Sequence, residues 1–402
     1  MDMLIDAINL IFIFVGIYFT FLFMLIFFAN EKKLFRRPKI KKFPSISIII
    51  PAHNEEDNIT ETIKCAKDLE YPRKKEIIVV DDGSTDKTFE LAKKIGDVRV
   101  LKKKRGGRAS ALNLGIKNAS GEIVACIDSD SCPEKKALLK TVPFFEKNVA
   151  AVTTAVFVKN PKGIMERMQE IEYFMVAWSR KLFEYLNAIY VTPGPMSLYR
   201  KDVLKKVGGF DEKNLTEDIE IAWRLIKYNY KIKMALDTKV YTNVPKTVKK
   251  WWHQRLRWNV GGMQTTFKYF NLFTKNEFGS IGTLILPLFS ISYALNILGI
   301  SFILYNLFTW VRFFIGSYLF GFNALDSLLV FYFTPDLFLF FVAINLILTV
   351  FFIRLNFKTI NNLVKTSTKI KDVLLYVFVY ICVFPLLLIH SSIKFFTKNY
   401  EW

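Results

Sequence analysis

The chain has 402 residues, of which 52% are hydrophobic and 16% aromatic, and its net charge is +20. Long uncharged runs lie near both ends, whereas most charged residues lie between positions 31 and 277. This composition argues against an ordinary soluble protein and predicts a membrane protein with a polar middle. The positive charge could indicate nucleic acid as a partner. No nucleic-acid motif is visible, however, so we expect no such partner.

The first apolar run, residues 7–29, is uncharged and long enough to cross a bilayer. It lacks the basic start and the small-residue cleavage site of a signal peptide. We therefore predict an N-terminal transmembrane helix within residues 1–30. The linker that follows, residues 31–44, is strongly basic. By the positive-inside rule, this linker and the polar middle should face the cytosol.

Strands and helices are predicted to alternate between residues 45 and 245. The predicted strands cover residues 46–50, 76–80, 98–101, 123–127 and 150–158. The predicted helices between them cover residues 57–69, 84–95, 108–118 and 134–145. Repeated strand–helix units with short connections indicate an α/β domain whose sheet is mostly parallel and covered by helices on both faces.

Two aromatic-rich helical stretches, residues 161–191 and 247–273, contain charged residues among the apolar ones. Each could belong to the core of the α/β domain or lie at the membrane surface as an amphipathic helix. The second stretch falls within a segment of interface helices that we place at residues 246–278.

The remaining residues, 279–402, form a predicted transmembrane region. Its apolar runs lie at residues 279–311, 337–353 and 373–393. Because basic residues lie between the last two runs, we expect four spans in total with both termini outside the cytosol. A fifth span through residues 311–325 is the second choice. The prediction is a multi-pass protein of the plasma membrane.

The strand predicted at residues 123–127 is followed by Asp128, Ser129 and Asp130. Open α/β folds bind ligands at the carboxyl ends of their strands. Two carboxylates one residue apart can share a divalent cation, which in turn can hold a diphosphate. Aspartate is also common in turns and helix N-caps, so this pair alone is a weak signal. The polar clusters elsewhere in the chain decide between the two interpretations.

Polar clusters also follow the first two predicted strands. They comprise Pro51, Ala52, His53 and Glu55 after the first strand, and Asp81 and Asp82 after the second. Because parallel strands end at one edge of the sheet, these residues should meet Asp128 and Asp130 in one crevice. An aspartate there can accept a hydrogen bond from the imide N–H of uracil. Together the clusters are more typical of a nucleotide pocket than of turns.

Two further segments carry candidate site residues. A basic loop at residues 102–107 leads into a helix through Arg108, and it is either a solvated charge run or a diphosphate site at a helix N-terminus. Glu217 and Asp218 open a later amphipathic helix. They are either acids that suit the helix dipole, or they include a general base, Asp218, for an acceptor hydroxyl.

Gln254, Arg257 and Trp258 share one face of a predicted helix through their i, i+3, i+4 spacing. The arginine could pair with a leaving diphosphate and the tryptophan could stack on a sugar ring. The same residues would also be ordinary on a helix at a membrane surface.

The four cysteines are scattered along the chain, at Cys65, Cys126, Cys132 and Cys382. No histidine or second cysteine pair completes a zinc-binding pattern around them. We therefore expect reduced cytosolic thiols without an assigned role.

In their order along the chain, these motifs resemble those of the membrane-embedded family 2 glycosyltransferases. The resemblance covers residues 45 to about 275 and rests on residues 81–84, 128–130, 194–200, 216–218 and 254–258. Residues 216–224 and 251–262 look most like the poly-β-1,6-N-acetylglucosamine synthases. Residues 194–200 look like the hyaluronan synthases, and the cellulose synthases share the general pattern.

The resemblance implies a GT-A fold for residues 45–245. It also implies a metal-dependent, inverting transfer of a sugar from a UDP-sugar, such as UDP-N-acetylglucosamine, to a growing polysaccharide with coupled translocation. The alternative is a single transfer to a lipid such as a polyprenyl phosphate. A membrane transporter is the second alternative. It would place charged residues within its spans, but such residues are sparse in the predicted spans. A catalytically dead scaffold is the third alternative.

The resemblance also implies individual roles. Asp218, Glu217 and Arg257 would be catalytic, Asp130 and Asp128 would bind Mg²⁺ or Mn²⁺, and the substrate-binding residues would be Pro51, Ala52, His53, Glu55, Asp81, Asp82, Arg108, Asp128, Ser129, Gly194, Gln254 and Trp258. His53 stands where many relatives have tyrosine, and Arg108 stands where many have lysine.

Overall fold

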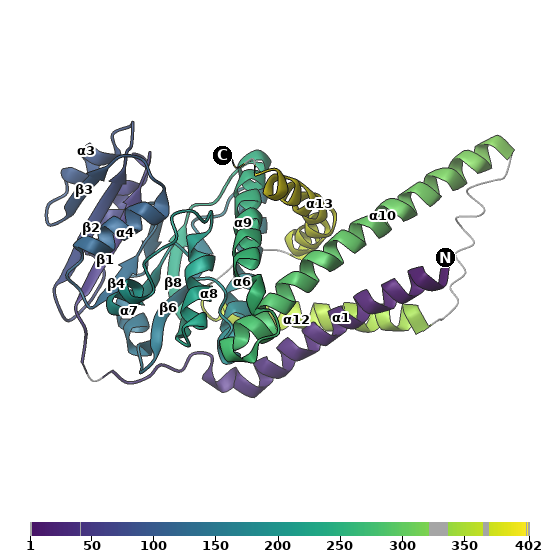
Figure 1. The fold of residues 1–402 in the computed structure, drawn as a ribbon, viewed down its shortest axis with the longest axis horizontal. Helices are drawn as coiled ribbons and strands as arrows, with labels where there is room; N and C mark the ends of the chain where they lie inside the picture. The colour runs from purple at the N-terminus through teal and green to yellow at the C-terminus, as the bar shows by residue number, and fades with distance from the viewer. Residues whose placement is uncertain (1, 41, 321–336, 365–369, 399, 401–402) are drawn as a thin grey trace.

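One eight-stranded mixed sheet forms the centre of the polar part of the chain (Figure 1). The computed structural model describes residues 2–40, 42–320, 337–364, 370–398 and 400. The strands are β1 (Ile46–Ala52), β2 (Lys75–Asp82), β3 (Arg99–Lys103), β4 (Ile123–Cys126), β5 (Ser131–Pro133), β6 (Val149–Val158), β7 (Ser197–Arg200) and β8 (Lys231–Thr242). Their order in the sheet is β3-β2-β1-β4-β7-β6-β8-β5.

The parallel part of the sheet aligns the strand ends that carry the candidate site. Strands β3, β2, β1 and β4 are parallel, with Ala52 opposite Asp81 and Ile49 opposite Cys126. Strand β7 is antiparallel to both β4 and β6, and β5 is antiparallel to β8. The predicted α/β architecture is confirmed, with the antiparallel strands confined to the half of the sheet beyond β4.

Helices cover both faces of the sheet because its central strands are apolar on both sides. Ile48 and Ile50 pack in one buried cluster, whereas Ile49 between them packs in the other, as the two-residue repeat of a strand requires. The shorter helices of the domain are α2 (Ile59–Lys67), α3 (Thr88–Lys93), α4 (Arg108–Asn118), α5 (Ala137–Thr141), α7 (Lys201–Lys206) and α8 (Glu217–Lys227). Helix α2 contributes to the cluster of Ile48, and α4 to that of Ile49.

Six longer helices complete the described chain: α1 (Asp2–Asn30), α6 (Ile164–Tyr185), α9 (Val248–Tyr269), α10 (Leu286–Phe320), α12 (Leu337–Asn361) and α13 (Ile370–Thr397). Helices α1, α10 and α12 extend away from the sheet, and α13 packs against α9 (Figure 1). Helix α6 joins the two parts, because its buried Trp178 contacts Phe27 of α1 and Phe352 of α12.

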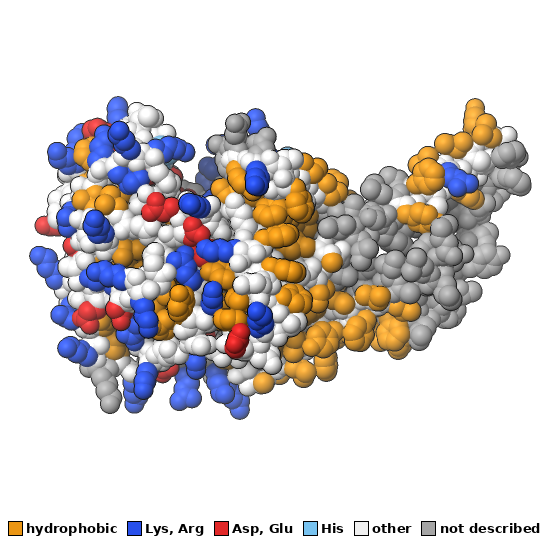
Figure 2. Space-filling view, in the orientation of Figure 1, with side chains coloured by type: hydrophobic (Ala, Val, Ile, Leu, Met, Phe, Trp, Pro, Cys, Tyr) orange, Lys and Arg blue, Asp and Glu red, His pale blue; other side chains and the backbone are white. Residues whose placement is uncertain are grey.

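Side-chain chemistry divides the molecule in the same way (Figure 2). Lysine and arginine side chains are spread over the α/β domain, whereas hydrophobic side chains cover much of the surface along α1 and the neighbouring helices. Within the described residues, three helical segments are long and apolar enough to cross a membrane: Ile13–Lys33, Ala343–Asn361 and Lys371–Thr397. Residues 321–336, which include the end of the alternative fifth span, lie outside the described part.

The expectation of reduced cysteines is wrong for two of the four. Cys65 of α2 and Cys132 of β5 form a disulfide, with their Cα atoms 5.5 Å apart. The physical reason is that α2 packs against β5, which brings together two residues separated by 67 positions. Cys126 at the end of β4 is a buried free thiol, as expected.

Candidate active site

The two aspartates that follow β4 face different partners. Asp128 Oδ1 accepts hydrogen bonds from Arg108 Nε at 2.8 Å and Nη2 at 2.5 Å. Asp130 Oδ1 accepts from the hydroxyls of Ser131 at 3.0 Å and Thr242 at 3.1 Å. Burial, and next the charge of Asp128, raise the pKa of Asp130 to about 6. Two close, partly desolvated carboxylates of this kind favour a cation between them.

The donor set fits a hard divalent cation that shares its coordination with a ligand. Within the described residues, no group of three aspartate, glutamate, histidine or cysteine side chains could hold a metal. Two carboxylates, completed by substrate phosphates and water, are the usual ligands of Mg²⁺ in nucleotide-using enzymes. Glu55 lies close enough to Asp128 to sense its charge. Burial raises the pKa of Glu55, and the negative charge of Asp128 raises it further. Ser129 supports the loop through its carbonyl oxygen, which accepts from Thr62 Oγ1 at 2.7 Å.

Asp81 presents an acceptor that the protein leaves unused. Its side chain is completely buried, and Oδ1 accepts from the backbone N–H of Ser84 at 3.3 Å. Oδ2 is buried and has no hydrogen-bond partner among the residues that the structure describes. An unpaired buried acceptor costs about 1–3 kcal/mol, so this oxygen is suited to a donor on a bound ligand.

Asp82 is used differently from its neighbour. Its Oδ1 accepts from Lys103 Nζ at 2.6 Å and from the N–H of Gly106 at 2.9 Å, and its Oδ2 accepts from the N–H of Gly107 at 2.7 Å. The carboxylate therefore anchors the basic loop of residues 102–107 to the sheet edge. Lys103, one of the cations of the loop that could bind a diphosphate, is thus already paired with Asp82.

The end of β1 forms the neighbouring wall of the crevice. Pro51 and Ala52 are its last residues and are buried. His53 follows, with Nδ1 3.0 Å from the carbonyl oxygen of Asp82 and Nε2 in contact with Arg105. The predicted convergence of the first two polar clusters is therefore present in the structure.

Arg108 connects the aspartate loop to helix α8. It is the first residue of α4, and besides Asp128 it contacts Glu217 Oε1 through Nη1. Burial would lower the pKa of Arg108, but Asp128 and Glu217 together raise it well above its usual value. Gly194 closes over this contact, since a Cβ there would lie 2.5 Å from Arg108 Nη2 and still closer to Asp128 Oδ2. Only a glycine lets the loop approach the pair so closely.

Asp218 lies beside this network in the first turn of α8. Its Oδ1 accepts from the backbone N–H of Ile219 at 3.0 Å. Burial and the adjacent Glu217 raise the pKa of Asp218 to about 7, against the opposing effect of Arg108 and Arg257. A carboxylate with a pKa near neutral can take a proton at physiological pH, which is the property of a general base.

Helix α9 carries the third set of predicted residues. Gln254, Arg257 and Trp258 are all partly exposed on it. Arg257 Nη1 donates to the carbonyl oxygen of Leu215 at 3.4 Å and lies near enough to Asp218 to lower its pKa. Among the described residues, no hydrogen bond or ring contact joins Gln254 or Trp258 to either aspartate of the loop after β4. Both instead contact the residue at position 255.

The sequence did not reveal the residues that hold the site in place. Ser129 and Asp130 are fixed by Thr62 and Thr242, which are 67 and 112 positions away. Arg255 lies within the motif of residues 254–258 but is buried, whereas Gln254, Arg257 and Trp258 are partly exposed. No local pattern marks partners of this kind, because only the fold brings them together.

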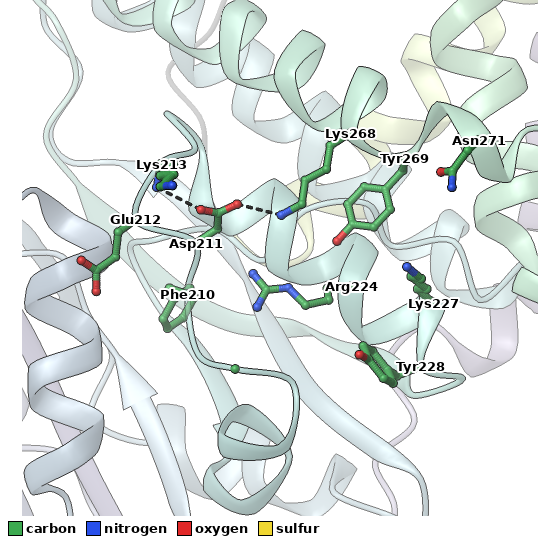
Figure 3. Close-up of a pocket in the computed structure, with 11 residues that line it drawn as sticks. Phe210, Asp211, Glu212, Lys213, Arg224, Lys227, Tyr228, Lys268, Tyr269 and Asn271 are labelled. Atoms are coloured by element: carbon green, nitrogen blue, oxygen red, sulfur yellow. Dashed lines mark hydrogen bonds and ion pairs between the residues drawn. The ribbon is translucent and has the colours of Figure 1, made fainter.

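A pocket of about 550 Å³ lies at the other ends of α8 and α9 (Figure 3). Its lining includes Arg224, Lys227, Lys268, Tyr269 and Asp211. Lys268 Nζ is 2.7 Å from Asp211 Oδ2, and Lys268 and Arg224 both bind the buried Glu220. Because these cations are paired within the protein, we place no part of the catalytic chemistry in this pocket.

Comparison with known proteins identifies the domain. Residues 47–208 match the family described as "Glycosyl transferase family 2". This stretch of the chain therefore resembles glycosyltransferase family 2. The poly-β-1,6-N-acetyl-D-glucosamine synthase of Staphylococcus epidermidis is 34% identical over 269 residues, and the probable glycosyltransferase YdaM of Bacillus subtilis is 32% identical over 253 residues. The first match covers 64% of this chain and 65% of the relative, and the second covers 60% of each.

A solved structure supports the GT-A-like fold. The mannosyltransferase PcManGT from Pyrobaculum calidifontis, in complex with GDP-Man and Mn²⁺, superposes with a TM-score of 0.58. The superposition covers 99% of this chain and all of the other, at 17% sequence identity. At that identity the likeness establishes the fold alone.

Proposed function

We propose that this glycosyltransferase moves a sugar from a UDP-sugar to the hydroxyl of a growing polysaccharide, with inversion at the anomeric carbon. The observation that carries the proposal is the chain of contacts from Asp128 through Arg108 to Glu217, beside Asp218 with its pKa near 7. The similarity to a staphylococcal poly-β-1,6-N-acetyl-D-glucosamine synthase supports UDP-N-acetylglucosamine or a close analogue as the donor.

The donor would bind across the carboxyl ends of β1, β2 and β4. The unpaired Oδ2 of Asp81 would accept the imide N–H of uracil, and Pro51 and Ala52 would form the wall beside the base. Asp128 and Asp130 would hold Mg²⁺ or Mn²⁺, and that ion would supply positive charge to the diphosphate when bound. A structural relative was solved with Mn²⁺ and a nucleotide sugar, which supports the assignment.

Asp218 would act on the acceptor. Its Oδ1 is held by the backbone N–H of Ile219, so Oδ2 is the atom that would take the proton of the attacking hydroxyl. The hydroxyl oxygen would then form a bond to the anomeric carbon as the bond to the UDP oxygen breaks, which inverts the configuration. Arg257 would offset the negative charge that develops on the departing UDP. Arg108 would contribute the charge that its pairing with Asp128 and Glu217 leaves.

We also propose the arrangement in the membrane. The catalytic part would comprise residues 45–245 on the cytosolic side, followed by interface helices at residues 246–278. Residues 1–30 and 279–402 would supply the membrane spans. The basic linker of residues 31–44 supports this orientation. The packing of α9 against α13 supports delivery of the product toward the membrane.

The test uses the full chain in lipid nanodiscs with radiolabelled UDP-sugars, in the presence of Mg²⁺, Mn²⁺ or EDTA. We expect label to enter a long polymer from one UDP-sugar, and EDTA to abolish the reaction. Product length on a gel separates the two acceptor classes, since a lipid acceptor would give a single short, extractable product. Absence of transfer from every donor in both metals would refute the proposal.

A further inference from the structure

The buried arginine between two predicted acceptor residues has a defined set of partners. Arg255 is 3% exposed and lies between α9 and α6. Its Nε donates to Glu172 Oε1 at 3.1 Å, and its Nη2 contacts Glu172 Oε2. The guanidinium and the carboxylate therefore form a two-pronged, charge-assisted contact. Burial would lower the pKa of Arg255, but Glu172 raises it well above its usual value, so the arginine stays charged.

The same guanidinium also contacts the two acceptor residues on either side. Its Nη1 donates to Gln254 Oε1 at 2.5 Å, and its central carbon lies 4.0 Å from the centre of the Trp258 ring. Oε1 of Gln254 already accepts this hydrogen bond, and the Nε2–H groups of the amide stay available as donors to a ligand. Arg255 covers one face of the Trp258 ring, and this partly exposed tryptophan would stack on a sugar through its opposite face.

We propose that Arg255, held by Glu172, is a positioning residue that orients Gln254 and Trp258 toward a neutral sugar of the acceptor. This inference rests on the proposed function, and it adds that Gln254 and Trp258, which the resemblance implies to be substrate-binding, meet the acceptor. Because the charge of Arg255 is balanced by Glu172, these two residues present an amide donor and an aromatic face. That combination suits the hydroxyls and the C–H face of a pyranose better than the phosphate of a polyprenyl phosphate.

A purely structural role for the ion pair is the alternative. The pair lies where α6, α9 and α13 meet, since Trp251 of α9 packs on Tyr380 of α13 with ring centres 6.5 Å apart. Its loss could simply loosen this junction. A second arginine–carboxylate pair, Arg167 with Asp372 at 3.3 Å, joins α6 to α13 and serves as a matched control.

Three variants separate the two roles. Arg255→Lys keeps the charge but cannot contact Glu172, Gln254 and Trp258 together. The exchange of Glu172→Arg with Arg255→Glu keeps an ion pair between the helices and removes the cation from position 255. Arg167→Gln breaks the control pair. The KM for an added acceptor oligosaccharide, the KM for the donor and the melting temperature are measured for each variant.

We expect the KM for the oligosaccharide to rise about tenfold in Arg255→Lys and in the exchange variant, as the loss of one oriented polar contact implies. The donor KM should stay within about twofold, and Arg167→Gln should match the wild type in both constants. An acceptor KM that the exchange variant restores to the wild-type value would overturn the inference, because the ion pair alone would then suffice.

A measurement without substrate separates this inference from the proposed function. The fluorescence of Trp258 is obtained by subtracting the spectrum of Trp258→Phe in each background, and its quenching by acrylamide is followed. We expect stronger quenching in Arg255→Lys and in the exchange variant, because the covered ring face opens to solvent. Unchanged quenching in these folded variants would overturn the positioning role. A wild type that transfers no sugar would instead refute the proposed function.

Discussion

Replacing Asp218 by asparagine removes the proposed base and also a half-buried ionisable group. The structure raises the pKa of Asp218 to about 7, mainly through burial and next through Glu217. Compared with an ordinary aspartate, at about 3.9, the difference corresponds to about 4 kcal/mol at about 1.4 kcal/mol per pKa unit. Because the side chain is partly exposed, water screens part of this effect, and we take about 2 kcal/mol as the expected value.

The size of the effect on the free energy of unfolding depends on pH. As the pH rises from 4 to 7, the unfolded chain loses the proton of Asp218 while the folded chain retains it. The free energy of unfolding therefore falls across this window, and the loss is complete above pH 7. Asparagine has no proton to lose. Asp218→Asn should thus equal the wild type in stability near pH 4 and exceed it by about 2 kcal/mol at pH 8.

The assay combines melting curves with turnover. Asp218→Asn in nanodiscs should melt at a higher temperature than the wild type at pH 8, while turnover is lost and UDP binding is retained. Wild-type turnover should rise with pH and level off above about 7. Asp211→Asn is the control, and it should lower the melting temperature at pH 8. Burial would raise the pKa of Asp211, but a hydrogen bond from Lys268 holds it below its usual value, so the ionised aspartate stabilises the fold. Retained turnover, or equal destabilisation of Asp218→Asn at both pH values, would refute the reasoning.

Two further changes test how the loop that carries the aspartates is held. Gly194→Ala should abolish transfer and weaken UDP binding at least about tenfold, because its Cβ would collide with Asp128 and Arg108; isothermal titration with UDP and Mn²⁺ measures this. Replacing Cys65 and Cys132 by serine should lower the free energy of unfolding by about 4 kcal/mol, as expected for a closed loop of this length. Melting curves with and without reductant check the second change, and reductant should leave the double variant unaffected.

The parallel half of the sheet could be predicted because its signals are local. Strands β1, β2 and β4 are continuous apolar runs that end in polar clusters, and the predicted starts of β1 and β4 agree with the structure. Strands β7 and β8 were not predicted. Strand β7 begins with Ser197 and ends with Arg200, so it has no continuous apolar run, and β8 mixes lysines and an aspartate with its apolar positions. Their place in the sheet depends on pairing with distant strands, which a local pattern does not record.

The site residues also divide into those marked by a local sequence pattern and those that depend on distant contacts. Residues at strand ends, such as Asp81 and Asp128, could be predicted because parallel strands deliver their ends to one edge. The role of Asp82 in holding the basic loop could not, because it depends on where that loop folds back. Glu172 also gave no signal, since it reaches Arg255 across 83 positions. The sequence indicates which side chains can take part in the chemistry, whereas the partners that orient these side chains depend on tertiary packing.

The disulfide bears on the proposed orientation of the domain. Disulfides are rare in the cytosol of mesophiles but common in intracellular proteins of hyperthermophiles, so Cys65–Cys132 and a cytosolic domain are compatible only in a cell of the second kind. The basic linker offers an independent test, because trypsin cleaves after lysine and arginine. In right-side-out vesicles the linker of residues 31–44 should resist trypsin, and in inverted vesicles it should be cut. Cleavage in right-side-out vesicles would place the catalytic domain outside the cell, where the disulfide would be ordinary and the positive-inside rule would have failed.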